Sequence, residues 1–363
     1  MGALLISPRR KKAMAVSVPS FTTATPRAAV ARDDALDFTK GILVLFMVLY
    51  HWLNYFVGIH GQYYNYLRFL TPSFIFITGF LISHIHFQKY ATESPRLSGR
   101  LMVRGLKLLG VFVALNVLMG LAVPGSLIRS SFAGIPLPVF LFSVFVTGNM
   151  VVYAGQKTFA FTILVPIAYL LMVSAGLNLL RTRIRYAFHY ACGLFLLWIF
   201  LLRTHGMQSF NLELLMIGLL GVVLGYARRE QIAAFVSHPF VLCGIYCLYL
   251  VAITIWEVTL PVQTAGALLT TILIYIAGKS REVPGIIRGR AILLGQYSLF
   301  GYISQIAILQ VLRRFSWFSD HGVVVLLVSL LLGFVLTVTV VGLLDWARVK
   351  SKMVNRSYQL VFA

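Results

Sequence analysis

The residues best suited to chemistry are a lysine and a histidine that stand eleven positions apart in the first long apolar stretch. Lys40 lies near the start of this stretch and His51 interrupts it. Eleven residues of α-helix make three turns plus about 20°, so both side chains share one face, roughly 16 Å apart along the axis. Asp33 or Asp34 would cap this helix, and Asp37 would pair with Lys40 one turn away.

An ionisable residue inside a membrane span is costly, so His51 is a functional candidate by default. A neutral imidazole there would act as a general base, and Tyr50 and Asn54 would orient it or a substrate. The alternative is a neutral histidine that is hydrogen-bonded to a neighbouring helix. We interpret His84 and His86, near the inner end of the second apolar stretch, as interfacial residues.

A basic cluster opens the third apolar stretch. Arg100, Arg104 and Lys107 follow one another at i+4 and i+3 spacing, so one helix face presents three cations. Anchoring at the cytoplasmic surface explains Arg100, but Arg104 and Lys107 lie one to two turns inside the apolar run. Together with Lys40, these cations would bind the phosphates of a carrier.

Small and polar residues interrupt two other apolar stretches. In the second, Thr71-Pro72 and Thr78-Gly79 are typical of helix packing through small residues. In the ninth, the run GQYSLFGYISQ favours a cavity wall over simple interhelical bonding. Its polar members are Gln296, Tyr297, Ser298, Tyr302 and Gln305.

The composition identifies the class of protein. Of 363 residues, 59% are hydrophobic and 11% are charged, against about 25% charged in soluble domains. Continuous apolar runs predict an all-α, polytopic transmembrane helical bundle. The net charge of +21 does not indicate nucleic acid, because the cations lie mostly in short loops, where the positive-inside rule explains them. Cys192, Cys243 and Cys247 fit small core residues, without disulfide or metal-ligand spacing.

The sequence predicts a transmembrane domain over residues 32–347. Residues 1–31 would be a disordered basic cytoplasmic tail, and residues 348–363 a second basic cytoplasmic tail. Ten spans place both termini and most basic loops in the cytoplasm. Counting residues 129–156 as an eleventh span would move basic clusters to the outer side. We therefore interpret this segment as re-entrant or as lying in the outer leaflet. The spans are about 41–57, 69–87, 101–123, 158–180, 187–203, 209–227, 237–257, 260–278, 291–312 and 322–345.

These motifs resemble the membrane acyltransferase-3 superfamily, which includes glucan succinyltransferases of the OpgC type. The superfamily opens with L-D-x-x-R-G and an Arg-x10-His pattern, which Leu36–Gly41 and His51 match in spacing. Phe76–Phe80, at the end of the second span, resembles its F-x-x-S-G-F/Y motif, and Gly295–Leu299 resembles its late G-x-x-S-L/Y motif. Arg100 to Arg104 resembles the basic motif that opens its third span. The heparan-glucosaminide N-acetyltransferases are a related alternative.

The chain also departs from the superfamily's pattern. Lys40 replaces the usual Arg, so a planar bidentate contact becomes a point charge. Gln305 stands where many members have His, and the basic spacing is Arg-x3-Arg rather than Arg-x2-Arg. These differences put the acyl donor in doubt more than the class of activity.

The resemblance implies an integral O-acyltransferase, expected in the bacterial inner (plasma) membrane. It would move an acetyl or succinyl group from cytoplasmic acyl-CoA to a glycan hydroxyl at the outer face, without a metal. Lys40, Arg100, Arg104 and Lys107 would hold the carrier's phosphates, and His51 would act as a general base or carry the acyl group. The alternatives are a transporter or flippase of a glycan or lipid-linked substrate, and a non-catalytic scaffold.

Overall fold

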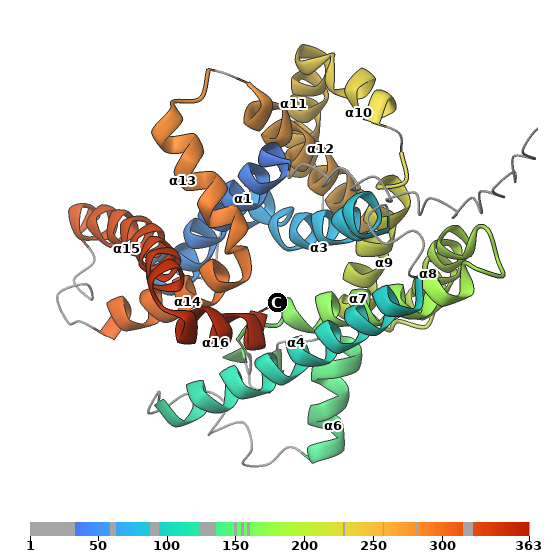
Figure 1. The fold of residues 1–363 in the computed structure, drawn as a ribbon, viewed down its shortest axis with the longest axis horizontal. Coiled ribbons are helices and arrows are strands. Elements are labelled where there is room, and N and C mark those ends of the chain that lie inside the picture. The colour runs from blue at the N-terminus through green and yellow to red at the C-terminus, as the bar shows by residue number, and fades with distance from the viewer. Residues whose placement is uncertain are drawn as a thin grey trace, which may run out of the picture. The chain divides into compact units, whose positions relative to one another are not determined.

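The computed structural model describes residues 33–58, 63–87, 94–122, 136–148, 151–153, 156–157, 160–227, 229–256, 258–280, 282–314 and 322–362. Nearly all of this is helix, so the predicted helical bundle is confirmed (Figure 1). The expected tail over residues 1–31 lies outside the described residues. The elements are α1 (Asp34–Trp52), η1 (Leu53–Val57), α2 (Tyr63–Leu67), α3 (Leu70–Leu81), η2 (Ile82–Phe87), α4 (Ser94–Ala122), α6 (Leu137–Phe142), η3 (Ser143–Thr147), β1 (Val151–Tyr153), β2 (Gln156–Lys157), α7 (Leu164–Leu180), α8 (Ala187–Thr204), α9 (Phe210–Leu224), α10 (Arg229–Val236), α11 (Pro239–Ile255), α12 (Leu260–Lys279), α13 (Gly285–Gln296), α14 (Ser298–Arg314), α15 (Val323–Lys350) and α16 (Lys352–Phe362).

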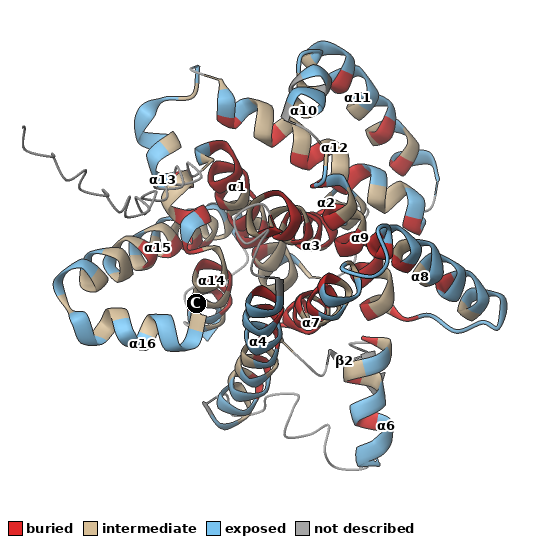
Figure 2. Cartoon of the chain, turned by 45° about the vertical axis from the view of Figure 1, so that its right-hand side comes forward, coloured by how far each residue is buried: buried red, intermediate tan, exposed pale blue. Residues whose placement is uncertain are grey.

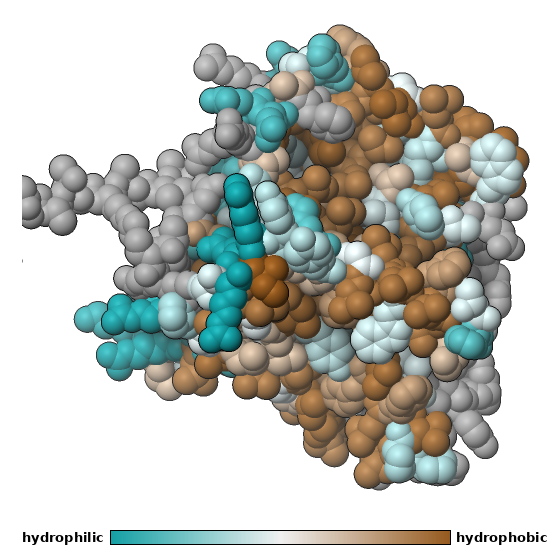
Figure 3. All heavy atoms as spheres, turned by 90° about the vertical axis from the view of Figure 1, so that its right-hand side faces the viewer, coloured by the Kyte–Doolittle hydropathy of each residue, from teal (hydrophilic) through white to brown (hydrophobic). Residues whose placement is uncertain are grey.

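Within the described residues, six helices are long and apolar enough to cross a membrane, and the bent pair α13–α14 would add a seventh. The chain is therefore a helical membrane-spanning protein. Large apolar side chains such as Leu194 and Phe200 on α8 are exposed, as expected for a surface that meets lipid. Hydrophobic residues cover much of the face drawn in Figure 3. Each of the ten predicted spans contains a helix, but α7, α9 and α11 are only 15–17 residues long.

Helix α1 lies among several partners. It packs against α3, α12, α13, α14 and α15. Buried residues concentrate on α1, α3, α7 and α9, whereas α8, α11 and α16 are largely exposed (Figure 2). The helix that carries Lys40 and His51 is thus held from several sides.

Glycine allows α1 and α13 to touch backbone to backbone. A Cβ added at Gly41 would overlap the carbonyl group of Ala291, and one added at Gly295 would overlap the carbonyl group of Asp37. In the same way, Gly79 of α3 meets the Gly218 carbonyl group on α9. These contacts support helix packing through small residues as the role of the Thr78-Gly79 motif.

The predicted span over residues 291–312 is not one straight helix. Helix α13 ends at Gln296, α14 begins at Ser298, and the two are bent by 95°. Tyr297 stands at the break, with backbone angles outside the helical region (φ −110°, ψ 28°). The run of polar residues that suggested a single cavity-facing stripe is therefore divided between two helix directions.

Within residues 129–156, α6 and η3 give one short apolar helix over Leu137–Thr147. It is followed by the antiparallel pair β1–β2. Eleven residues rise roughly 16 Å, about half of the hydrocarbon thickness of a bilayer. This length favours a segment that enters the membrane without crossing it.

The interpretation of all three cysteines as core residues was wrong for Cys243 and Cys247, which are exposed on α11. Helix α11 packs mainly against α12 and also contacts α2, and many of its other side chains are exposed. At the other end of the chain, α15 continues to Lys350 and α16 covers most of the predicted C-terminal tail.

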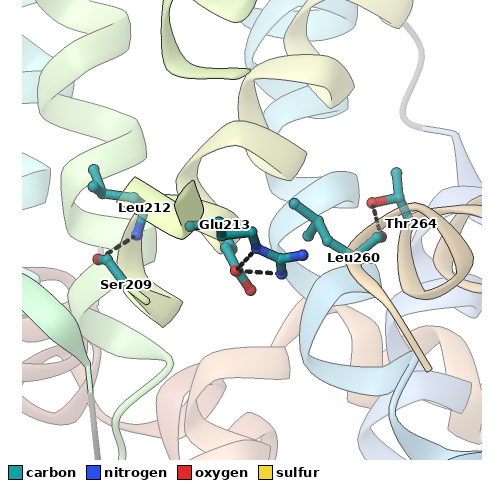
Figure 4. Close-up of polar contacts among 6 residues, drawn as sticks. Ser209, Leu212, Glu213, Leu260 and Thr264 are labelled. Carbon is teal, nitrogen blue, oxygen red and sulfur yellow. Dashed lines mark hydrogen bonds and ion pairs between the residues drawn. The ribbon is translucent and has the colours of Figure 1, made fainter. Parts of the chain in front are cut away.

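The turn between α8 and α9 is fixed by polar contacts. The Ser209 hydroxyl oxygen accepts a hydrogen bond of 3.3 Å from the Leu212 N–H and caps α9. One turn later, a carboxylate oxygen of Glu213 lies 2.7 Å from an Arg203 guanidinium nitrogen. Figure 4 shows Ser209, Leu212 and Glu213 together at this end of α9.

Candidate active site

The first turns of α1 form as the sequence predicts. The Asp33 carboxylate caps the helix and accepts hydrogen bonds from the Ala35 and Leu36 N–H groups at 3.0 and 3.4 Å. The Tyr275 hydroxyl of α12 donates to the other carboxylate oxygen of Asp33 at 3.1 Å. The predicted pair is present as well, with the Lys40 Nζ atom 2.6 Å from the Asp37 Oδ1 atom.

A cavity of about 160 Å³ gathers residues from six separate elements. Its polar lining consists of Lys40 from α1, Thr78 from α3, His86 from η2, Arg104 from α4, and Ser298 and Tyr302 from α14. Leucine and isoleucine side chains of α7 and other helices supply much of the remaining wall. Among the described residues that line the cavity, none is acidic, so its polar groups are cations, an imidazole and hydroxyls.

The cavity is small. A void of roughly 150 Å³ is enough to hold a benzene molecule. A phosphate or a short acyl group therefore fits inside, and a nucleotide-sized carrier would have to lie mostly beyond its mouth.

Arg104 reaches the cavity because α4 packs tightly on α7 at the next residue. A Cβ added at Gly105 would lie 2.6 Å from the Met172 Cγ atom, so α4 could not approach this closely with a larger residue there. The Arg104 side chain remains exposed, as expected for a residue at an open rim.

Helix α16 lies beside this rim. Its Tyr358 ring lies 4.0 Å from the guanidinium carbon of Arg348. Burial raises the pKa of the Tyr358 hydroxyl, and the positive charges of Arg348 and Arg104 oppose that rise. The C-terminal helix thus contributes to the electrostatic surroundings of Arg104.

His51 lies in aromatic surroundings next to the cavity and is not among its lining residues. Measured between ring centroids, the imidazole is 5.3 Å from Tyr50, 6.2 Å from Tyr55 and 6.1 Å from Tyr302. Because Tyr302 also lines the cavity, it links His51 to the cavity.

Tyr50, Tyr55 and Asn54 form a supporting network around His51. The Asn54 side-chain amide donates a hydrogen bond of 3.1 Å to the Tyr50 carbonyl oxygen. The Tyr55 hydroxyl accepts a hydrogen bond of 3.2 Å from the Gln310 side-chain amide. Asn54 therefore supports Tyr50, which packs on the imidazole.

Two of the four cations expected to bind phosphate are not among the cavity-lining residues. Arg100 is exposed and Lys107 is half-buried. The i+4 and i+3 spacing of this cluster covers a face about 60° wide. The cavity takes up only the part of that face that carries Arg104.

The polar residues after Gly295 separate in the same way. Ser298 and Tyr302 line the cavity, whereas Gln296 is exposed. The Tyr297 hydroxyl donates a hydrogen bond of 2.6 Å to an Asp345 carboxylate oxygen on α15. Gln305 is fully buried, and neither polar atom of its amide has a hydrogen-bond partner within the described part of the chain.

His86 lines the cavity, although the sequence pattern predicts an interfacial role for both His86 and His84. His84, by contrast, is buried and stacked on Phe80, and its Nδ1 atom lies 3.4 Å from the Gly225 carbonyl oxygen. The two histidines lie in the π-helical segment η2. Such segments are rare and often occur at functional sites, but a sequence pattern does not reveal them.

Comparisons of the chain with protein-family models, with curated proteins and with solved structures each found no match. The resemblance to membrane acyltransferases therefore rests on the motifs Leu36–Gly41 with His51, Phe76–Phe80, Arg100 to Arg104, and Gly295–Leu299. Of their polar members, Lys40, Thr78, Arg104 and Ser298 line the cavity described above.

Proposed function

We propose that this protein is a membrane O-acyltransferase that moves an acetyl or succinyl group from cytoplasmic acyl-CoA to a glycan hydroxyl at the outer face. The observation that carries the proposal is one cavity that contains Lys40 and Arg104 and is linked through Tyr302 to His51. Residues that are distant in sequence would thus supply an anion site and a nearby imidazole. An acyltransferase that uses acyl-CoA needs the first to bind the donor and the second to act as a base or nucleophile.

The anion site suits the charged part of the carrier. Lys40 and Arg104 would contact phosphate oxygens, with the Thr78 and Ser298 hydroxyls as further donors. Asp37 holds Lys40 in place and neutralises part of its charge. Arg104 would therefore supply the larger share of the attraction for the carrier. Most of the nucleotide would stay at the cytoplasmic mouth, because the cavity is too small for it.

His51 would act on the acyl group at the end of the carrier's extended arm. As a general base, its neutral imidazole would take the proton of the acceptor hydroxyl while the oxygen attacks the thioester carbonyl carbon. The carbon–sulfur bond would then break, and the leaving thiolate would take up a proton. In the other route, the imidazole nitrogen would attack the thioester carbonyl carbon first, and the carbon–sulfur bond would break to release the thiol. The acceptor oxygen would then displace the imidazole from the acyl-histidine, and the freed imidazole would take the acceptor's proton.

For the membrane topology, we propose ten spans with both termini in the cytoplasm, in a bacterial inner membrane. The support is six long apolar helices, the bent pair α13–α14 and the shorter apolar helices α7, α9 and α11, together with the concentration of Arg and Lys in the loops that this count places inside. Three of these helices are short, and local thinning of the bilayer would accommodate them. The Leu137–Thr147 helix would enter from the outer face without crossing.

One observation favours a different class of function, a transporter or flippase. The 95° break between α13 and α14 resembles the broken helices on which transporters build their substrate sites. In such proteins, breaks occur at corresponding positions of two structural halves. A second, matching break would be needed to place this chain in that class.

Acyl transfer by the purified protein tests the proposal. The protein in detergent or in nanodiscs is incubated with acetyl-CoA or succinyl-CoA that carries a labelled acyl group, and with a glycan extract. Mass spectrometry then measures label on the glycan and release of free coenzyme A. Binding of acyl-CoA with neither transfer nor hydrolysis would contradict the proposed reaction. Equal labelling of the glycan in a control without the protein would show that the transfer does not depend on this protein.

A further inference from the structure

We propose that the cavity is a proton-linked anion site, in which His86 adds a third positive charge when it is protonated. The inference rests on the proposed function, which identifies the carrier that brings the anionic group. Its basis is geometric, because His86, Lys40 and Arg104 come from three separate elements and line one small cavity.

Among the described residues that line the cavity, the charged side chains, Lys40 and Arg104, are both cations. Besides Lys40, Arg104 and His86, the described lining has one more titratable side chain, that of Tyr302, and a tyrosine is neutral at physiological pH. Helix α4, which packs against η2, also carries Arg96, Arg100 and Lys107. On the other side of η2, the Arg181 guanidinium lies 5.0 Å from the centroid of the Phe87 ring, and Tyr226 stacks on the same ring. The nearest carboxylate in this set is Asp37, which is paired with Lys40.

This arrangement has a consequence for binding. A proton on His86 attracts an anion in the cavity and is repelled by the neighbouring cations when the cavity is empty. Anion binding and proton uptake therefore favour each other, by reciprocal linkage. Histidine commonly titrates between about pH 5 and 8, so this coupling acts within the physiological range. An anionic group would be held more firmly at low pH and released as pH rises.

The inference identifies the class of ligand as a phosphate or pyrophosphate group, the kind that two or three cations and hydroxyl donors recognise together. The location also agrees with the proposed topology. In that topology α3 runs inward and continues as η2, which ends at Phe87. His86 would therefore lie in the cytoplasmic half with Lys40, where a soluble carrier arrives. His51, by contrast, would lie deeper, towards the reacting end of the carrier.

The test is the affinity for coenzyme A, measured by calorimetry on the detergent-purified full chain at pH 5.5 and pH 8. From pH 8 to pH 5.5, the affinity of the wild type should rise about tenfold more than the affinity of His86→Gln does. The reason is that the wild type has a charge-assisted contact at pH 5.5 that is lost as the imidazole deprotonates. The ligand's own titration affects both proteins equally and cancels in this comparison. His86→Lys keeps a permanent charge, so it should bind tightly at both pH values.

Controls separate the possible failures. His205→Gln changes an exposed histidine on the α8–α9 turn and should behave like the wild type. The same pH dependence in wild type and His86→Gln, with both folded, would overturn the inference and leave the proposed function standing. Failure of the wild type to bind coenzyme A at either pH would overturn both, whereas proton-linked binding without acyl transfer would remove the proposed reaction alone.

Discussion

The Tyr302 ring lies 6.1 Å from the His51 ring, and Tyr302 also forms part of the wall of the cavity that contains Lys40 and Arg104. Tyr302 is itself buried and contacts Phe161 at 6.1 Å on another side. Its position is therefore well fixed. A shift of the Tyr302 ring would change the contact between the imidazole and the cavity wall. His51 and Tyr302 are therefore the first targets for mutation.

Replacing His51 should abolish transfer and spare carrier binding. General-base catalysis by one positioned side chain contributes typically 10²–10⁴-fold, so His51→Ala should lose at least about a hundredfold in rate. His51→Asn keeps hydrogen bonding but no basicity and should fail equally. The measurement is acyl transfer per folded protein, together with acyl-CoA affinity. Near-normal turnover by His51→Asn would exclude the imidazole from the mechanism and leave it a packing role among the tyrosines.

Tyr302 should matter more for its ring than for its hydroxyl. Tyr302→Phe keeps the contacts with His51 and Phe161 and should cost less than about 1.5 kcal/mol of stability. Tyr302→Ala removes a buried ring and should cost about 3–5 kcal/mol. Thermal unfolding in detergent measures both changes. Equal melting temperatures for the two variants would show that this ring does not support the site.

The basic residues of α4 should differ sharply in their effect on carrier binding. Arg104→Gln should weaken acyl-CoA binding by about ten- to a hundredfold, since a charge-assisted contact is worth roughly 1.5–3 kcal/mol. Lys107→Gln is the matched control. It also removes one positive charge, but Lys107 lies one turn after Arg104 and is not among the residues that line the cavity. Equal losses in both variants would indicate a general effect of positive charge at the membrane surface.

Local sequence rules predicted the part of the site that depends on one helix. The Asp33 cap, the Asp37–Lys40 pair and the uninterrupted helix from Lys40 to His51 all follow from capping preference and from the 3.6-residue repeat. The positions of the other helices follow from the apolar runs, which are also a local property of the sequence. These features depend on neighbours in sequence, so they can be predicted from a single sequence.

Features that depend on other helices could not be predicted in this way. Nothing in the run around Tyr297 shows a 95° bend, and proline is missing from it. The bend follows a backbone contact between Gly295 and Asp37 on another helix. Likewise, His86 joins the cavity only because η2, α1, α4 and α14 converge there, and sequence spacing does not report that convergence.

The proposed topology makes its own prediction. Reporter fusions at residues 158, 205 and 259 should report the outer side, and fusions at 183 and 283 the cytoplasm, because only an even number of spans keeps the basic clusters inside. The fusion at 205 is the most informative, since it follows α8 and precedes the short helix α9. A cytoplasmic signal there would contradict the ten-span arrangement and point to an additional crossing by the segment around Leu137–Thr147.

Gly41 should tolerate no side chain, although it lies in an ordinary helical position of α1. A Cβ there would overlap the Ala291 carbonyl group, so Gly41→Ala must push α13 away from α1, at a cost of about 1–3 kcal/mol or more. Because α13 leads directly into Ser298 and Tyr302, the same shift should reduce carrier binding and transfer. Gly110→Ala is the matched control, since a Cβ at Gly110 of α4 would meet nothing within 4 Å. Melting temperature and transfer rate measure both variants, and a Gly41→Ala protein as stable and active as Gly110→Ala would show that the close contact of α1 with α13 does not hold the cavity together.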